Sequence, residues 1–462
     1  MKIFLIVLDV LMAGFANFVL VNSFFEIKKN KTWFIYYIFY FLFVVPVLLD
    51  RLYSFPNYAT GFRYGYIVMS SDPLVTVIYD LIISFIAFVF YYFLQIKQIA
   101  PIKSDKPSLI KDPIIKAVLL FVCVLPVLMF GVACVVSKRN PLMIFDLGWK
   151  YKYEQGQLGP EIFGYSAIER LTYISIVCCF LLLFNIEYKV TFKKDENGKH
   201  NVKRIILTSL IVLALLFAFG MCLLLEGKRS IYLYAGLIFL VVIIYKVIGK
   251  VNPWFILGFF VLFSVAVAFV VIFQGKEFRS ALKYGEGLTP YKYASLRVDF
   301  FRDQSLKFVI YCMLHYDEIH IVSYPFQSYL TEIFYLFPIV YLPIPFKCGY
   351  ETYLTAAYLF TDRSSLDNMR VTNSGLDELC ANFSLIGVLI YAAILFWLFK
   401  TLAKSSDDWS IILIACFILF MMYTTSYVIW FYEFAIGLYI IKRFADYIRK
   451  RKGITLDAKA AN

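Results

Sequence analysis

Long apolar runs set the strongest limit on the fold of this chain. Runs of about 18 or more apolar residues recur along its length, and each can cross a hydrocarbon layer about 30 Å thick. Lipid offers backbone polar groups no partner, so such runs are predicted to be helices. Charged residues make up 17% of the chain, against about 25% in soluble domains. The sequence therefore predicts an all-α polytopic membrane protein, with residues 1–462 forming a single integral membrane domain.

About eleven transmembrane helices are predicted from these runs. They cover residues 3–24, 33–49, 73–95, 114–136, 166–186, 205–225, 231–247, 254–274, 381–399, 409–424 and 427–441. The basic connections are 26–31, 95–111, 187–204, 245–250 and 442–453, and the positive-inside rule assigns them to the cytoplasm. The N-terminus is then predicted outside and the C-terminus inside. These loops also account for most of the net charge of +13, so no nucleic-acid partner is expected.

Two long segments face outward in this topology, residues 137–165 and 275–380. Loops of such length without structure of their own are uncommon and are usually functional. Within the second segment, prolines interrupt the apolar stretch 328–346. A re-entrant or interfacial helix is therefore predicted there rather than a full span.

Charged side chains gather on the predicted outer face. The cations are Lys228 and Arg229 in a short turn, then Arg279, Arg297, Arg302 and Arg370. The guanidinium group presents a planar fork of donors that suits diphosphate oxygens. The nearby carboxylates of Asp303, Asp377 and Glu378, or the imidazole of His320, could accept a proton from a hydroxyl group. The pattern indicates a site for a membrane-borne anionic substrate, and no metal or other cofactor is expected.

Structural explanations exist for the same residues. An arginine at the end of a span can anchor to lipid headgroups. Residues 295–313 could form an amphipathic helix lying on the membrane. Asp377 and Glu378 could simply cap the next helix, whose N-terminal dipole favours anions.

One stretch resembles a known family. Residues 373–395, NSGLDELCANFSLIGVLIYAAIL, resemble a late segment of the Wzy-type polymerases, which polymerise the oligosaccharide repeat units of O-antigens and capsules. Members commonly carry a glycine, a glutamate, an Asn-Phe-Gly and a second glycine there. The matching positions are Gly375, Glu378, Asn382, Phe383 and Gly387, with Ser384 in place of the expected glycine. Residues 226–240, 298–314 and 337–351 are similar to other segments of that family, although the last lacks the arginine often seen there.

The resemblance implies a membrane-embedded, GT-C-like, metal-independent glycosyltransferase. It would join undecaprenyl-diphosphate-linked oligosaccharides, as donor and acceptor, into O-antigen or capsular polysaccharide at the outer face of the bacterial inner membrane. A chain-length regulator is a further candidate partner besides the lipid bilayer. By position, the family's arginine role falls on Arg229, Arg279, Arg297 and Arg302. With the other outer charges, the predicted catalytic residues are Arg229, Glu378, Asp303 and His320, and the predicted substrate-binding residues are Arg279, Arg297, Arg302, Lys228 and Arg370.

Three other functions stay open. A lipid-linked oligosaccharide flippase predicts charged residues buried in the middle of spans, where the sequence places only Asp9 and Asp80. The related O-antigen ligase also uses an arginine and a histidine in a long outer loop, which His315 or His320 could supply. A purely structural membrane protein would leave residues 275–380 without a role.

Overall fold

A computed structural model describes the stretches 2–27, 29–48, 72–99, 113–146, 149–154, 162–186, 202–226, 229–247, 301–336, 349–359, 371–405 and 408–423, and the single residues 156, 258 and 447. Within these stretches the regular elements are all helices. The chain forms two compact units. Unit 1 comprises Met1–Ile102, Lys250–Ser405 and Leu413–Val428, and unit 2 comprises Lys103–Gly249, Ser406–Ile412 and Ile429–Asn462.

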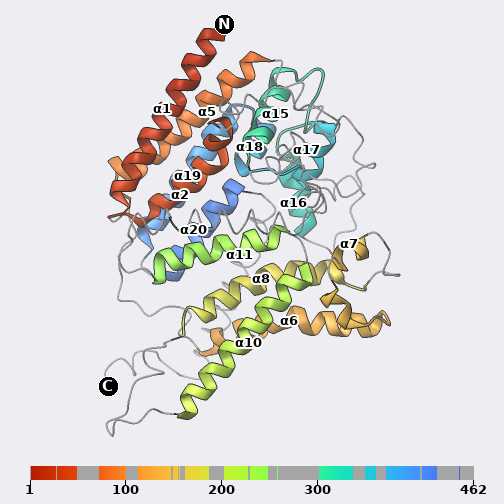
Figure 1. Ribbon diagram of the computed structural model, residues 1–462. Helices are drawn as coiled ribbons and strands as arrows, with labels where there is room; N and C mark the ends of the chain where they lie inside the picture. Colours follow the sequence, from red (N-terminus) through yellow and green to blue (C-terminus); the bar gives the residue numbers. More distant parts are fainter. Residues whose placement is uncertain are drawn as a thin grey trace, which may run out of the picture. The chain divides into compact units, whose positions relative to one another are not determined.

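Unit 1 contains long apolar helices and a group of shorter ones. Its elements are α1 (Lys2–Glu26), η1 (Lys31–Trp33), α2 (Phe34–Phe39), η2 (Tyr40–Val44), α5 (Pro73–Tyr91), η3 (Tyr92–Ile96), α15 (Asp303–Leu314), α16 (Gln327–Leu336), α17 (Tyr350–Leu359), α18 (Gly375–Phe383), α19 (Ile386–Lys404) and most of α20 (Asp408–Tyr423). Helix α1 packs along α5, and α15 packs against both α5 and α18 (Figure 1). Helix α16 contacts α17 and α18. The short helices thus connect to the long ones through α15 and α18.

Helix α18 and helix α19 are separated by a sharp break. The sequence predicts one span that begins at residue 381, but α18 ends at Phe383 and α19 begins at Ile386. Between them Ser384 has a φ of 54°, a left-handed backbone conformation that a continuous right-handed helix cannot contain. The predicted boundary is therefore wrong by several residues, because the break depends on backbone geometry that hydrophobicity does not reveal.

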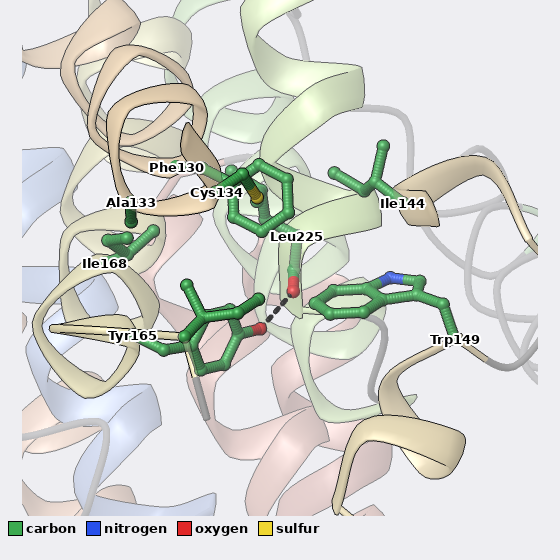
Figure 2. Packing of buried hydrophobic residues seen from close by; sticks show 9 residues of the cluster. Phe130, Ala133, Cys134, Ile144, Trp149, Tyr165, Ile168 and Leu225 are labelled. Atoms are coloured by element: carbon green, nitrogen blue, oxygen red, sulfur yellow. Dashed lines mark hydrogen bonds between the residues drawn. The ribbon is translucent and has the colours of Figure 1, made fainter. Parts of the chain in front are cut away.

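Unit 2 is built around helix α8. Its elements are α6 (Pro113–Val136), η5 (Pro141–Phe145), α7 (Trp149–Glu154), α8 (Tyr165–Leu183), α10 (Val202–Glu226), α11 (Arg229–Val242) and η6 (Ile243–Val247). Helix α8 packs against α6, α10 and α11. Part of the predicted first outer loop folds into η5 and α7, and Trp149 of α7 joins a buried apolar cluster with Phe130, Tyr165 and Leu225 (Figure 2).

Side chains of that cluster also donate hydrogen bonds to backbone carbonyl oxygens at the C-terminus of helix α10. The hydroxyl of Tyr165 donates to the carbonyl oxygen of Leu225 at 2.6 Å (Figure 2). The indole Nε1 of Trp149 donates to the carbonyl oxygen of Leu224 at 2.8 Å. The last carbonyl oxygens of a helix have no hydrogen-bond donor within the helix. Here two neutral side chains, those of Tyr165 and Trp149, provide the donors.

Among the described residues, five helical segments are long and apolar enough to cross a membrane. They are Lys31–Leu48, Pro73–Ile96, Ile115–Val136, Ile205–Glu226 and Ile386–Lys404. Shorter apolar helices cover Val10–Glu26, Leu171–Leu183 and Tyr234–Tyr245. The predicted spans 254–274 and 427–441 lie outside the described residues, apart from Gly258. The described helices fit a multi-pass membrane protein, while eleven spans and their orientation stay predictions.

Candidate functional site

Helix α15 is buried on nearly all sides. Its buried residues include the polar Asp303, Gln304 and Ser305 as well as the apolar Leu306 and Phe308. A helix that lies on a membrane surface would turn its polar side to water. The amphipathic surface helix considered for this stretch is therefore not what forms, and α15 is an interior element of unit 1.

The start of α15 lies against two candidate spans, near Leu42, six residues before the end of Lys31–Leu48, and near Tyr79, six residues after the start of Pro73–Ile96. The backbone nitrogen of Arg302 donates to the carbonyl oxygen of Leu42 at 3.0 Å, and Leu42 belongs to the span Lys31–Leu48. The Nζ atom of Lys307 lies 4.9 Å from the centre of the Tyr79 ring in α5. The sequence predicted these charges in a loop beyond the helix ends, whereas they lie beside helix interiors.

Asp377 closes the N-terminus of α18. Its Oδ1 atom accepts hydrogen bonds from the backbone nitrogen of Ser374, at 2.5 Å, and from the Ser374 hydroxyl. The Ser374 Oγ atom accepts from the backbone nitrogen of Asp377 at 3.3 Å, completing a capping box. Burial raises the pKa of Asp377 to about 7, against the opposing effects of the bonds to Ser374 and the positive charge of Arg302. The capping role considered from the sequence is confirmed for Asp377.

Glu378 has different partners. Its Oε1 atom accepts from the hydroxyl of Ser328 in α16 at 2.6 Å. The amide nitrogen of Asn382 donates to the same Ser328 Oγ at 2.8 Å and to the backbone oxygen of Glu378 at 2.9 Å. The Glu378 side chain is fully buried. The carboxylate of Glu378 therefore joins α18 to α16, while Asp377 forms the cap.

Arg302 is the N-cap of α15 and Asp303 its first residue, and α15 packs against α18. Arg302 is 1% exposed, and its Nη1 atom donates to the carbonyl oxygen of Phe301 at 2.9 Å. The Oδ2 atom of Asp303 lies 3.5 Å from Nζ of Lys307. We name one buried group the polar network: Arg302, Asp303, Ser328, Asp377, Glu378 and Asn382. It combines a donor fork for anions with carboxylates that can accept protons.

Three predicted site residues come together in this network: Arg302, Asp303 and Glu378. His320 lies exposed on the turn between α15 and α16, with its ring 5.6 Å from that of Tyr316. Arg229 begins α11 in unit 2, and its side chain is outside the described ones. Lys228, Arg279, Arg297 and Arg370 lie outside the described residues.

Two residues near the carboxylates escaped sequence reasoning. Ser328 gave no signal, because its role depends on a partner 50 residues away. Tyr350 looked like one of many aromatic residues near span ends. Burial raises its pKa, and the negative charges of Asp377 and Glu378 raise it further, which places the phenol near both carboxylates.

Two glycines allow close backbone approach around α18. A Cβ atom on Gly375 would lie 2.9 Å from both Cγ and the carbonyl oxygen of Met421. On Gly387 it would lie 2.2 Å from the carbonyl oxygen of Leu379. Any side chain at either position would therefore clash with neighbouring backbone.

The described residues show no metal site, and comparison with known proteins shows no family for this chain. Among the described residues, no group of three or more His, Cys, Asp or Glu side chains could hold a metal ion. The chain matches no protein-family model, no curated protein and no solved structure. The resemblance to the polymerases therefore rests on the short motifs between residues 226 and 395.

Proposed function

We propose that this chain is a membrane-embedded glycosyltransferase that polymerises undecaprenyl-diphosphate-linked oligosaccharides at the outer face of a bacterial inner membrane. The polar network carries the proposal. It buries Arg302 with the carboxylates of Asp303, Asp377 and Glu378 beside apolar helices. Ionisable groups inside a membrane protein are expensive, so they commonly mark a functional site. The motif around Glu378 indicates which function.

The reaction needs an anion clamp and a proton acceptor. Arg302 would bind the diphosphate of the growing chain. A hydroxyl of the incoming repeat unit attacks the anomeric carbon, the bond from that carbon to the diphosphate oxygen breaks, and lipid diphosphate leaves with the electron pair. Glu378 or Asp377 takes the hydroxyl proton, and a pKa of about 7 for Asp377 suits proton acceptance near neutral pH. The diphosphate bond supplies the driving force.

Access to this site requires movement. Asp377 and Glu378 are fully buried and Arg302 nearly so. A diphosphate can reach them only if α15, α16 or α18 shifts, as lids and loops do in many enzymes. The same burial excludes water, which would otherwise compete with the acceptor hydroxyl.

A gel ladder of the surface polysaccharide tests the proposal. Cells without the protein should make only single repeat units, and the wild-type chain should restore the ladder. Glu378→Gln and Arg229→Ala should each lower polymer at least about 100-fold, the loss typical of removing a charged transition-state contact. Glu26→Gln is the matched control, because that carboxylate pairs with exposed Lys29 at the end of α1. Normal ladders from Glu378→Gln, with the protein inserted and folded, would overturn the assignment.

A flippase is the second candidate, favoured by the position of the charges. The buried charges at the start of α15 lie against the sides of two candidate spans, and Asp80 within α5 is also buried. Such placement is typical of transport pathways. In that case deletion would trap lipid-linked units on the cytoplasmic side. An O-antigen ligase would instead leave finished polymer on its lipid.

A further inference from the structure

The turn between α15 and α16 presents aromatic side chains to the outside of unit 1. We name residues 315–326 the aromatic loop. Tyr316, Tyr324 and Phe326 are all exposed, Phe326 by 57%. Exposed rings need a reason when several share one short segment.

The backbone holds the ring of Phe326 in this position at a conformational cost. Its φ is 68°, a conformation that is rare for a bulky residue and that concentrates at ligand clamps and active sites. The neighbouring bonds fix the loop. The Ser323 nitrogen donates to Oε1 of Gln327 at 2.5 Å, and the Leu330 nitrogen donates to the Phe326 carbonyl oxygen at 2.9 Å.

The aromatic loop is continuous with the polar network. The Phe326 ring meets that of Phe383 edge to face, with centres 4.5 Å apart. Phe383 directly follows Asn382, whose amide bonds Ser328, and Ser328 lies two residues after Phe326. A ligand resting on Phe326 would therefore lie next to the residues that hold Glu378.

The chemistry of the loop suits a sugar better than a lipid. A pyranose ring has a C–H face, which the negative face of an aromatic ring attracts, and a rim of hydroxyls. The loop adds exposed Asp317, Glu318 and His320, which can bond hydroxyls. Exposed rings also occur in membrane interfaces, but the two carboxylates would repel lipid phosphates.

We propose that the aromatic loop binds pyranose rings of the oligosaccharide substrate, with Phe326 as the stacking surface. The inference rests on the proposed function and names the part of the substrate that this surface takes. His320, predicted from the sequence as catalytic, then becomes a substrate-binding residue that bonds sugar hydroxyls.

Binding without turnover tests this inference. The probe is oligosaccharide released by mild acid from the surface polysaccharide of the producing cell, titrated calorimetrically into the full chain in nanodiscs. Phe326→Ala should weaken binding about tenfold, whereas Phe326→Trp, which keeps a ring, should stay within about twofold. Phe163→Ala is the control, because that ring is 78% exposed in unit 2.

Unchanged oligosaccharide affinity in Phe326→Ala would overturn the inference. The same holds if Phe326→Ala changes only the association of the protein with phosphatidylglycerol vesicles, since the ring would then be a lipid anchor. Glu378→Gln separates the two proposals. This variant should bind the oligosaccharide with normal affinity and make no polymer. Normal polymer together with normal oligosaccharide binding would refute the polymerase assignment but not the sugar-binding role of the aromatic loop.

Discussion

Both units bury polar groups, but among the described residues unit 1 buries more carboxylates. In unit 2, Tyr165 and Trp149 donate neutral hydrogen bonds to the last carbonyls of α10. The carboxylate of Glu226 is buried there and accepts from the Tyr173 hydroxyl at 3.1 Å, and Lys150 pairs with Glu169 at 3.3 Å. In unit 1, the carboxylates of Asp303, Asp377 and Glu378 and the guanidinium group of Arg302 are all buried, with Lys307 beside Asp303.

This difference separates structure from function. Ending a helix inside protein requires donors for its free carbonyls, so folding alone explains the bonds of Tyr165 and Trp149 in unit 2. Folding does not require an excess of buried carboxylates, because an apolar interior of equal volume is commonly as stable. The buried carboxylates of unit 1 are therefore the stronger candidates for proton transfer.

Arg302→Ala should give the largest loss of stability. Removing one partner from a buried charge group costs about 3–5 kcal/mol, because the remaining charges are left buried. Thermal unfolding of the purified protein in detergent measures the loss, with Arg139→Ala in unit 2 as the comparison. A loss below about 1 kcal/mol would mean that the network is hydrated rather than dry.

Stability should fall as pH rises through neutrality. Burial raises the pKa of Asp377 from 3.8 to about 7, so between these values the folded protein holds a proton that the unfolded chain has lost. The stabilisation is complete below about pH 4 and is lost as pH approaches 7, by about 4 kcal/mol in total. Melting temperatures at pH 5 and pH 8 should show the decline, and Asp377→Asn should abolish it. A wild-type protein with equal stability at both values would contradict a buried, proton-binding Asp377.

Gly387→Ala should destabilise the protein by about 3 kcal/mol, the upper range for overpacking. The new methyl group would lie 2.2 Å from the Leu379 carbonyl oxygen, and backbone cannot easily move aside. Gly220→Ala in α10 is the control, because nothing lies within 4 Å of its Cβ position and alanine favours a helix. Equal melting temperatures for both variants would show that α18 and α19 separate more freely than their packing suggests.

Tyr165→Phe should cost only about 1 kcal/mol, the net value of one neutral hydrogen bond. The variant removes the bond to the Leu225 carbonyl oxygen and keeps the ring in its apolar cluster. Chemical denaturation reports the change, and polymer formation should persist. Loss of polymer without loss of stability would show that the Tyr165 hydroxyl itself is needed for polymer formation.

Ser384→Gly should stabilise the protein by about 1 kcal/mol. Serine has a φ of 54° there, where glycine has no steric penalty. A rise in melting temperature with an unchanged polysaccharide ladder is the expected result. Destabilisation would mean that the Ser384 side chain contributes more than its backbone conformation costs.

The sequence predicted most of the described long helices but not the break that shapes the candidate site. The predicted spans 73–95, 114–136 and 205–225 agree with the structure within a few residues, because the length of an apolar run is a local property. The start of α19 was predicted several residues too early, since the break at Ser384 follows from backbone geometry. The motif around Glu378 identified a member of the polar network without indicating its partners.

The sequence alone determined that this chain is helical, apolar and built to cross a membrane, because helix length and hydrophobicity are local properties. It also located Arg302, Asp303 and Glu378 as unusual charges. Only the tertiary structure decided that these charges lie together beside helix interiors, that Asp377 forms the cap while Glu378 bonds Ser328, and that Phe326 stands beside them. These relations join segments far apart in the chain, and the packing of α15, α16 and α18 creates them.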